Sequence, residues 1–319
     1  MSSQPLTVVF GGGAIGNRDP WTKPEDLDNV YSILLKHNCT HIDSAQLYGE
    51  SEATLGLTKA GEKFTIDTKW VGGFTGGGGS SRENIVKSGQ ESIKKLGVKQ
   101  VDIFYLHSPD PKTPIEETLA GVQEIYQLGL FKRFGVSNFK PEAVQQVYDH
   151  CKEQGYVLPT VYQGNYSPVA RRQETTLFPV LRKLGIAFYA YSPLAGGFLT
   201  KTPQQLEEGA GRFNDEVIGG MYKRMYVKPT LIKALETWAS IAEQEGATKA
   251  ELAYRWVTYN SPLKKENGDA IIIGASKHEQ LEQTLAGIEK GKLSDKAVKD
   301  IDEIWEQIKD EAPLDNYNG

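Results

Sequence analysis

Short apolar runs alternate along this chain with longer segments whose apolar residues recur at helical spacing. Short runs rich in Val, Ile, Phe and Tyr, each bounded by turn residues, are typical of buried strands. Eight such runs predict strands at Thr7–Phe10, Thr40–Asp43, Phe64–Trp70, Val101–His107, Arg133–Val136, Thr160–Gln163, Ile186–Tyr191 and Ala270–Gly274. The other segments predict helices at Lys23–Asn38, Ser51–Ala60, Ser81–Gly97, Pro114–Gly129, Lys140–Gly155, Thr175–Gly185, Pro229–Tyr259, Lys277–Lys290 and Ser294–Lys309.

This strict alternation of strand and helix predicts a parallel sheet with helical crossovers. Eight units in 319 residues are typical of a closed (β/α)8 barrel, the TIM barrel, rather than an open doubly wound sheet. We therefore expect an α/β fold with a single domain over residues 1–319 and an extra C-terminal helix. The longest irregular segment, Ser192–Lys228, follows the seventh strand and is too rich in aromatic residues for a plain linker.

Composition and charge narrow the classes of partner. The net charge is -5 and no long Lys/Arg run is present, so neither nucleic acid nor an anionic membrane is an expected partner. No apolar run is long enough for a transmembrane helix, and the start MSSQPLTVVF lacks the features of a secretory signal. Cys39 and Cys151 lack the spacing of a metal site, so we expect no metal. The simplest expectation is a reduced cytoplasmic protein, a monomer or a homodimer.

The glycine-rich start, Gly11 to Gly16, matches the G-x-G-x-x-G pattern of a Rossmann dinucleotide site. That site requires a helix to open at the third glycine, with its N-terminus facing the pyrophosphate. The residues that follow, Asn17 to Pro24, do not have a helical pattern, and Asp43 is too far away to be the acid of the next strand. We therefore interpret this segment as a flexible loop at the mouth of the first strand.

Four chemically active residues follow the ends of consecutive predicted strands. Asp43 ends the second strand, Lys69 lies near the end of the third and His107 ends the fourth, while Tyr48 lies on the loop after the second. In a parallel barrel these strand ends open at one mouth. Lys69 beside Tyr48 would lower the tyrosine pKa, and Asp43 would hold Lys69 charged and oriented. Each residue alone is more often structural, but the four together predict a tyrosine that protonates a carbonyl oxygen.

Several long segments resemble the aldo-keto reductase superfamily: HIDSAQLYGESEATLG, the lysine of FTIDTK, the histidine of DIFYLHSPD, and GVSNF. Others, YQGNYSPVARRQETTLFPVLRKLGIAFYAYSPLAGGFLT, YKRMYVKP and IIIGASKHEQLEQTL, resemble its aflatoxin-aldehyde reductase branch. The resemblance covers nearly the whole chain. It implies a (β/α)8 barrel that binds NADPH without a Rossmann fold, with Tyr48 as general acid and Asp43, Lys69 and His107 completing a catalytic tetrad.

The resemblance also implies positions for the cofactor. It places the nicotinamide at Ser137, Asn138 and Gln163, with Tyr191 stacked on the ring; the pyrophosphate at Ser192, Leu194 and Gly196; and the adenosine 2'-phosphate near Gly274, Ser276, Lys277, Gln280 and Gln283. Gln280 and Thr284 depart from the Arg and Asn usual in the family. These departures weaken the electrostatic preference for NADPH over NADH, which Lys277 partly restores.

We expect the substrate pocket to be lined by residues of the variable loops: Trp21, Trp70, Phe74, Phe139, Arg212, Phe213, Tyr222, Arg224 and Tyr226. The aromatic residues favour apolar carbonyl compounds, and the resemblance implies aromatic aldehydes, dicarbonyls and semialdehydes. Arg212 or Arg224 would bind a substrate carboxylate, contact a cofactor phosphate or lie on the surface. The predicted activity is NADPH-dependent reduction of these small carbonyl compounds to alcohols.

Two other functions compete with this prediction. The first is a cofactor-binding regulatory subunit with the same fold and little turnover. The second is a short-chain dehydrogenase, a Rossmann enzyme that also pairs tyrosine with lysine. That family places the two residues four positions apart on one helix, whereas a strand–helix interval separates Tyr48 from Lys69 here.

Overall fold

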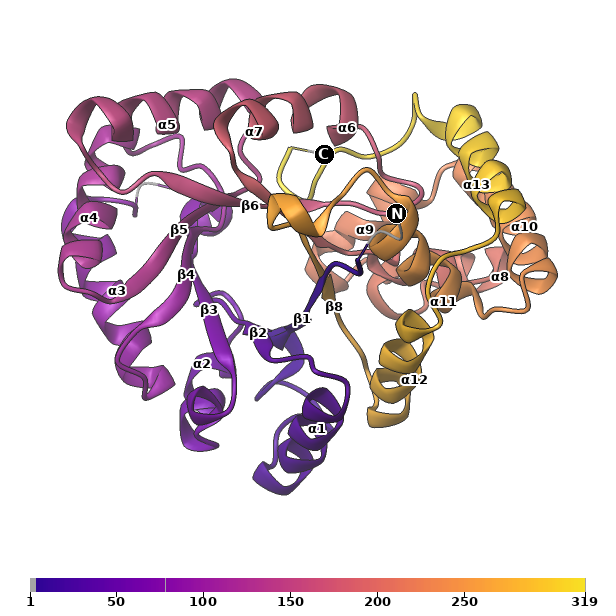
Figure 1. Ribbon diagram of the computed structural model, residues 1–319, viewed down its shortest axis with the longest axis horizontal. Coiled ribbons are helices and arrows are strands. Elements are labelled where there is room, and N and C mark those ends of the chain that lie inside the picture. Colours follow the sequence, from indigo (N-terminus) through magenta and orange to yellow (C-terminus); the bar gives the residue numbers. More distant parts are fainter. Residues whose placement is uncertain (1–3, 78, 319) are drawn as a thin grey trace.

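Eight parallel strands close into a barrel in chain order, so that the first strand pairs with both the second and the eighth. The computed structural model describes residues 4–77 and 79–318. Its strands are β1 (Thr7–Gly11), β2 (His41–Asp43), β3 (Thr65–Trp70), β4 (Val101–Leu106), β5 (Phe131–Ser137), β6 (Pro159–Asn165), β7 (Ala187–Tyr191) and β8 (Ala270–Ile273). The predicted (β/α)8 barrel is confirmed, and Figure 1 shows the helices around the central strands.

The helices on the outside follow the predicted alternation for most of the chain. They are α1 (Pro24–Lys36), α2 (Ser51–Leu57), α3 (Arg82–Leu96), α4 (Ile115–Gln127), α5 (Pro141–Gln154), α6 (Gln173–Thr176), α7 (Phe178–Leu184), α8 (Pro203–Glu207), α9 (Met221–Tyr226), α10 (Pro229–Gln244), α11 (Lys249–Arg255), α12 (His278–Glu289) and α13 (Asp295–Ile308). Helix α3 shows how their ends are set. The Ser81 hydroxyl accepts a hydrogen bond from the Asn84 amide at its start, and Gly97 ends it with a φ of 64°.

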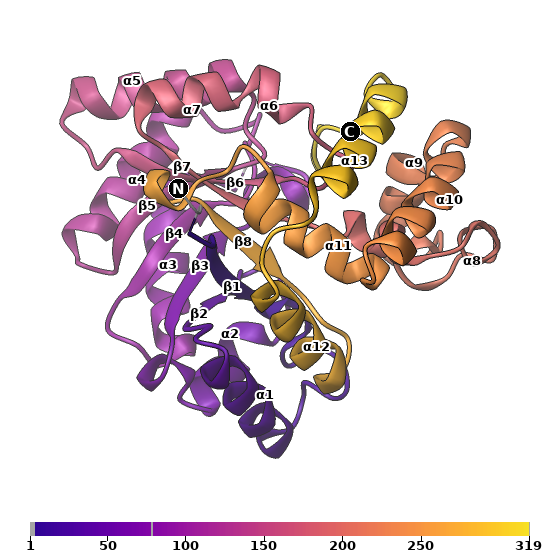
Figure 2. The same cartoon turned by 45° about the vertical axis from the view of Figure 1, so that its right-hand side comes forward.

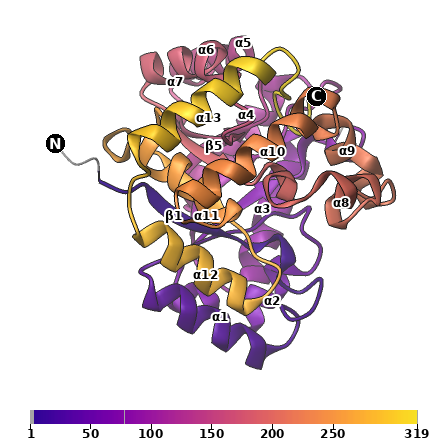
Figure 3. The same ribbon diagram turned by 90° about the vertical axis from the view of Figure 1, so that its right-hand side faces the viewer.

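Two predictions about the second half of the chain are wrong. The segment Ser192–Lys228 is not irregular throughout, because it contains α8, α9 and short 3₁₀ turns. The single helix predicted over Pro229–Tyr259 is interrupted between α10 and α11. Gly246 has a φ of 64° there, and the Thr248 hydroxyl accepts a hydrogen bond from the Glu251 amide to begin a new helix. Figures 2 and 3 show α8, α9 and α10 together on one side of the barrel.

The glycine-rich start does not open a helix. Gly11 ends β1, a 3₁₀ turn covers Gly12–Ala14, and the first α-helix begins only at Pro24. A helix N-terminus is therefore absent from the place where a Rossmann pyrophosphate would bind, which agrees with the interpretation as a loop. None of the helices in the described part of the chain has the length and hydrophobicity needed to span a membrane.

The interior of the barrel changes from apolar to polar along the strands. A buried cluster inside the barrel consists of Val9, Ile103, Tyr105, Val161, Ala187, Tyr189, Ala270 and Ile272, with a larger apolar core around it. Toward the carboxyl ends of the strands, the buried residues become polar: Asp43, Lys69, His107, Ser137 and Gln163. Because parallel strands open at one end, these polar groups gather at the mouth of the barrel.

Candidate active site

Lys69 is the centre of the polar group at the mouth. Its side chain is completely buried, and its Nζ donates to Asp43 Oδ2 at 2.6 Å and to the Ser44 carbonyl at 2.7 Å. The same nitrogen lies 4.8 Å from the centre of the Tyr48 ring. The structure therefore brings Asp43, Tyr48 and Lys69 together, as the strand ends predicted.

His107 completes this group from the end of β4. Its ring lies edge-on to Tyr48, with centroids 5.7 Å apart, and edge-on to Phe74 at 5.1 Å. Its Nδ1 is buried and has no hydrogen-bond partner among the described residues. The residue is 8% exposed, and a neutral imidazole carries one donor and one acceptor nitrogen, so His107 can hydrogen-bond a group that enters the mouth, such as a carbonyl oxygen.

The pKa of the Tyr48 hydroxyl is raised above its ordinary value, because burial disfavours the phenolate. The charge of Lys69 and its hydrogen bond act in the opposite direction, whereas Asp43 raises the pKa further. The predicted lowering by Lys69 is thus present, but burial outweighs it. Tyr48 stays protonated at neutral pH, and Lys69 stabilises the phenolate only once the proton has left.

Lys69 and His107, the two neighbours of Tyr48, differ in their charge states. Burial acts to lower the pKa of Lys69, but Asp43 and Tyr48 raise it above its ordinary value, so this ammonium stays charged. The pKa of His107 is well below its ordinary value because the ring is buried and faces the charge of Lys69. His107 is therefore a neutral imidazole at physiological pH and acts as a hydrogen-bonding group rather than as a cation.

Four residues expected at the nicotinamide are hydrogen-bonded to this group in two separate sets. Gln163 Nε2 donates to Asp43 Oδ1 at 3.0 Å, and Asn138 Nδ2 donates to the His107 carbonyl at 2.9 Å and to Ser137 Oγ at 3.1 Å. The Tyr191 hydroxyl donates to Asn138 Oδ1 at 2.8 Å. Asn138, which has a φ of 62°, thus joins the ends of β4, β5 and β7 beside the tetrad.

The turn after β7 holds the residues expected at the pyrophosphate. Ser192, Ala195 and Gly196 all have φ between 53° and 69°, so the backbone curls tightly on leaving the barrel. A Cβ on Gly196 would lie 2.2 Å from the Tyr222 ring, so only glycine fits there. Backbone amides in such tight turns are suited to anionic groups, and Leu194 packs against the core beside them.

The residues expected at the adenosine phosphate lie at the start of α12 and are exposed: Gly274, Ser276, Lys277, Gln280 and Gln283. Gln280 Oε1 accepts a hydrogen bond from the Ser276 amide at 3.1 Å, so this side chain closes the turn into the helix. The Lys277 ammonium has no hydrogen bond or ion pair with the residues that the structure describes. A free ammonium and hydroxyl at a helix N-terminus fit a phosphate.

The residues expected to line the substrate pocket fall into two groups. Trp21 is buried in the core against Phe10 and His278, and Phe139, Phe213 and Tyr226 are also buried. Trp70 is only partly buried and donates to Ser80 Oγ. Arg224 binds the Gly219 carbonyl at the surface.

Tyr222 connects the loop after β7 to the mouth. Its hydroxyl receives a hydrogen bond from Arg212 Nη1 at 3.1 Å and lies 3.4 Å from Ser192 Oγ. The structure therefore places Arg212, rather than Arg224, next to residues expected to bind the cofactor.

The C-terminal tail reaches the mouth, which the sequence patterns did not indicate. The Asn316 amide donates to the Tyr191 hydroxyl at 3.3 Å, and Asn318 Nδ2 donates to the Asn138 carbonyl at 3.1 Å. Tyr317 packs edge-on to Phe74. The tail follows α13 without regular structure, so no periodicity could have predicted where it lies.

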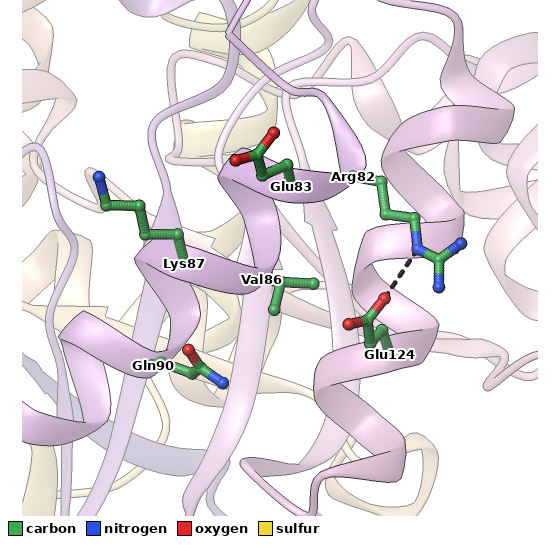
Figure 4. Close-up of a pocket in the computed structure, with 6 residues that line it drawn as sticks. All are labelled: Arg82, Glu83, Val86, Lys87, Gln90 and Glu124. Atoms are coloured by element: carbon green, nitrogen blue, oxygen red, sulfur yellow. Dashed lines mark hydrogen bonds and ion pairs between the residues drawn. The ribbon is translucent and has the colours of Figure 1, made fainter.

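A surface depression of about 440 Å³ lies away from this group, between α3 and α4. Figure 4 shows its lining, which includes Arg82, Lys87 and Glu124. Arg82 and Glu124 form an exposed ion pair at 2.7 Å. None of the tetrad residues lines this depression, so it has no part in the chemistry of the mouth.

Comparison with known proteins agrees with this geometry. Residues 7–306 match the Aldo/keto reductase family. Aldo-keto reductase family 7 member A3 of Homo sapiens is 38% identical over 307 residues, 90% of each chain. Aflatoxin B1 aldehyde reductase member 4 of Homo sapiens is 38% identical over 310 residues, again 90% of each chain. Oxidoreductase sirO of Leptosphaeria maculans is 39% identical over 284 residues, 88% of this chain and 86% of that one.

These matches extend over nearly the whole barrel and include all the strand ends at the mouth. Enzymes of this family reduce carbonyl groups and typically use a nicotinamide cofactor. The chain belongs to the aldo/keto reductase family and is an oxidoreductase, with aflatoxin B1 aldehyde reductases among its relatives.

Proposed function

We propose that this protein reduces aldehydes and ketones to alcohols with NADPH, and that Tyr48 supplies the proton. The observation that carries the proposal is the contact chain from Asp43 through Lys69 to Tyr48, with the His107 ring edge-on to Tyr48. A protonated phenol, a fixed cation and a neutral imidazole at one buried place are suited to a carbonyl oxygen that gains negative charge.

Each residue of the tetrad has a separate role in the proposed reduction. NADPH supplies the hydride when it is bound. Tyr48 donates its proton to the carbonyl oxygen, and Lys69 stabilises the phenolate that remains. Asp43 keeps Lys69 charged and in place, since its Oδ2 accepts from Nζ at 2.6 Å. His107 is neutral and hydrogen-bonds the same oxygen, which orients the substrate for protonation.

The cofactor site is built from three parts. Ser137, Asn138 and Gln163 hold the nicotinamide carboxamide, for which amide side chains supply both donors and acceptors. Tyr191 would lie against the ring, and the turn at Ser192, Leu194 and Gly196 would contact the pyrophosphate. The exposed start of α12, with Ser276, Lys277, Gln280 and Gln283, binds the 2'-phosphate and favours NADPH over NADH.

The substrates are small aromatic aldehydes, dicarbonyls and semialdehydes. Phe74 and Trp70, both only partly buried, supply the apolar and aromatic surface, and Phe74 stands directly against His107. Arg212 contacts the Tyr222 hydroxyl, so its cation is placed for an anionic group at the edge of the mouth. Two relatives named as aflatoxin B1 aldehyde reductases support an aldehyde as substrate.

A substrate panel tests this proposal. NADPH and NADH oxidation are followed with 4-nitrobenzaldehyde, phenylglyoxal and succinic semialdehyde, and cofactor binding is measured separately by fluorescence. Turnover of at least one carbonyl with a lower KM for NADPH than for NADH is the expected result. Tight cofactor binding without turnover of any compound would instead favour the regulatory subunit, and equal KM values would contradict the NADPH preference.

A further inference from the structure

Asp67 is a carboxyl group inside the barrel with no role in the chemistry described above. It lies in the middle of β3, two residues before Lys69, and stands opposite Asp43 of β2 in the strand register. Its side chain is completely buried. The strand register therefore places the two carboxyl-bearing residues side by side in the barrel.

The two carboxyl groups have unequal partners. Asp43 accepts from Lys69 and from Gln163. Asp67 Oδ1 accepts only a backbone hydrogen bond, from the Ile103 amide at 3.0 Å, and its Oδ2 has no partner in the part of the chain described. The hydroxyl of Tyr105, on the neighbouring strand, is also buried without a described partner.

The cations of the barrel interior are paired elsewhere. Lys69 Nζ is occupied by Asp43 and the Ser44 carbonyl, and Arg133 of β5 pairs with Asp102 of β4 at 2.6 Å. Arg133 also donates to the Tyr189 hydroxyl of β7. An ionised carboxylate at Asp67 would thus be buried without a cation of its own, which is costly.

The electrostatics agree with this geometry. Burial, followed by the charges of Asp43 and Asp102, raises the pKa of Asp67 well above its ordinary value. Arg133 and the Ile103 amide lower the pKa of Asp67, but their effect is smaller than the increase. In turn, a negative Asp67 would raise the pKa of Lys69, and also those of Tyr105 and Tyr189.

We infer that the Asp67 carboxyl group remains protonated in the folded protein, so that Lys69 keeps Asp43 as its carboxylate partner and stays against Tyr48. This inference rests on the proposed role of Tyr48. A second negative charge at Asp67 would compete for Lys69 and would oppose formation of the Tyr48 phenolate. The neutral carboxyl group fills its place in the barrel without that competition.

Asp67→Asn tests the inference because asparagine has the same shape, is always neutral and can still accept from the Ile103 amide. We expect kcat to stay within about threefold of wild type, since the wild-type group is also neutral. At alkaline pH the wild-type kcat should fall as Asp67 ionises. In the variant this fall should be absent. A loss of kcat of about a hundredfold at neutral pH would overturn the inference, because it would show that the charge is needed.

Unfolding provides a readout that does not depend on turnover. Wild-type Asp67 must take up a proton on folding, because its pKa is ordinary in the unfolded chain and raised in the folded one. As the pH rises above the ordinary Asp pKa of about 4, wild type should therefore lose stability relative to Asp67→Asn, by about tenfold in the unfolding constant per pH unit until Asp67 ionises in the folded protein. A stability difference between wild type and Asp67→Asn that does not change with pH would overturn the inference. It would show that Asp67 acts only as the acceptor for the Ile103 amide.

Two controls separate the outcomes. Asp269→Asn also removes a buried carboxylate, but one that is paired with Arg182, so it should destabilise the protein throughout this pH range. In wild type, infrared spectra with isotope-labelled aspartate should show a protonated carboxyl band at pH 7, and its absence would contradict the inference even where a variant fails to fold. If instead Tyr48→Phe kept full activity, the proposed function would fail while these measurements on Asp67 would stand.

Discussion

Two lysines, one in the mouth of the barrel and one at the start of α12, show how differently this protein prepares its two sites. Lys69 is fully buried and held by Asp43 and the Ser44 carbonyl. Lys277 is exposed and makes no contact of this kind with the described residues. Folding alone thus holds Lys69 in place, whereas Lys277, the proposed phosphate-binding residue, is left in solvent.

The largest expected effect is that of Lys69→Met. It removes the group proposed to stabilise the Tyr48 phenolate and leaves Asp43 buried without its cation. We expect kcat to fall by about 10²- to 10⁴-fold and the free energy of unfolding to fall by about 3–5 kcal/mol. Steady-state kinetics and urea unfolding measure both. Wild-type stability with normal turnover would contradict the role given to this ion pair.

The next largest effect is expected for His107→Leu. The substitution removes the neutral hydrogen-bonding group but leaves Lys69 and Tyr48 in place, so kcat should fall by about a hundredfold. Cofactor affinity, measured by fluorescence, should change little. If KM for the carbonyl rose while kcat stayed constant, His107 would contribute to ground-state binding only.

Lys277→Met is the matched substitution at the other site. We expect KM for NADPH to rise by about tenfold, as for the loss of one charge-assisted hydrogen bond, with kcat and KM for NADH unchanged. The stability should change by no more than about 0.5 kcal/mol, because the residue is exposed. An equal loss with both cofactors would remove Lys277 from the 2'-phosphate site.

The smallest effect is expected from pH. Tyr48 has a raised pKa and stays protonated, and His107 has a lowered pKa and stays neutral. The value of kcat/KM for reduction should therefore be constant between about pH 6.5 and 8 and should fall at higher pH as acidic protons are lost. A change in rate near the ordinary pKa of histidine that disappears in His107→Leu would contradict the neutral imidazole.

The parts of the site that follow from strand order could be predicted from the sequence. Asp43, Lys69 and His107 each sit at a strand end, and a parallel barrel brings such ends to one mouth whatever the details of packing. The break after α10 was missed because a single glycine, Gly246, interrupts a pattern that otherwise continues. Trp21 was expected near the substrate, but its burial depends on Phe10 and His278, which are distant in sequence.

Two further features depend on packing that no local pattern reports. The tail reaches Tyr191 and Asn138 through hydrogen bonds of Asn316 and Asn318 after a stretch without regular structure. In the sequence Asp67 is one polar residue in a strand. That its carboxyl group has no cation partner follows only from the folded barrel. Long-range contacts of this kind decide burial and charge, and spacing along the chain does not contain them.

The most direct test of the account is the rate of hydride transfer in Tyr48→Phe, measured in a single turnover with bound NADPH. Phenylalanine keeps the ring against His107 and above Lys69 but removes the proton. The account predicts a fall of about 10²- to 10⁴-fold in that rate, with NADPH affinity nearly unchanged. A wild-type rate of hydride transfer in this variant would contradict Tyr48 as the proton donor.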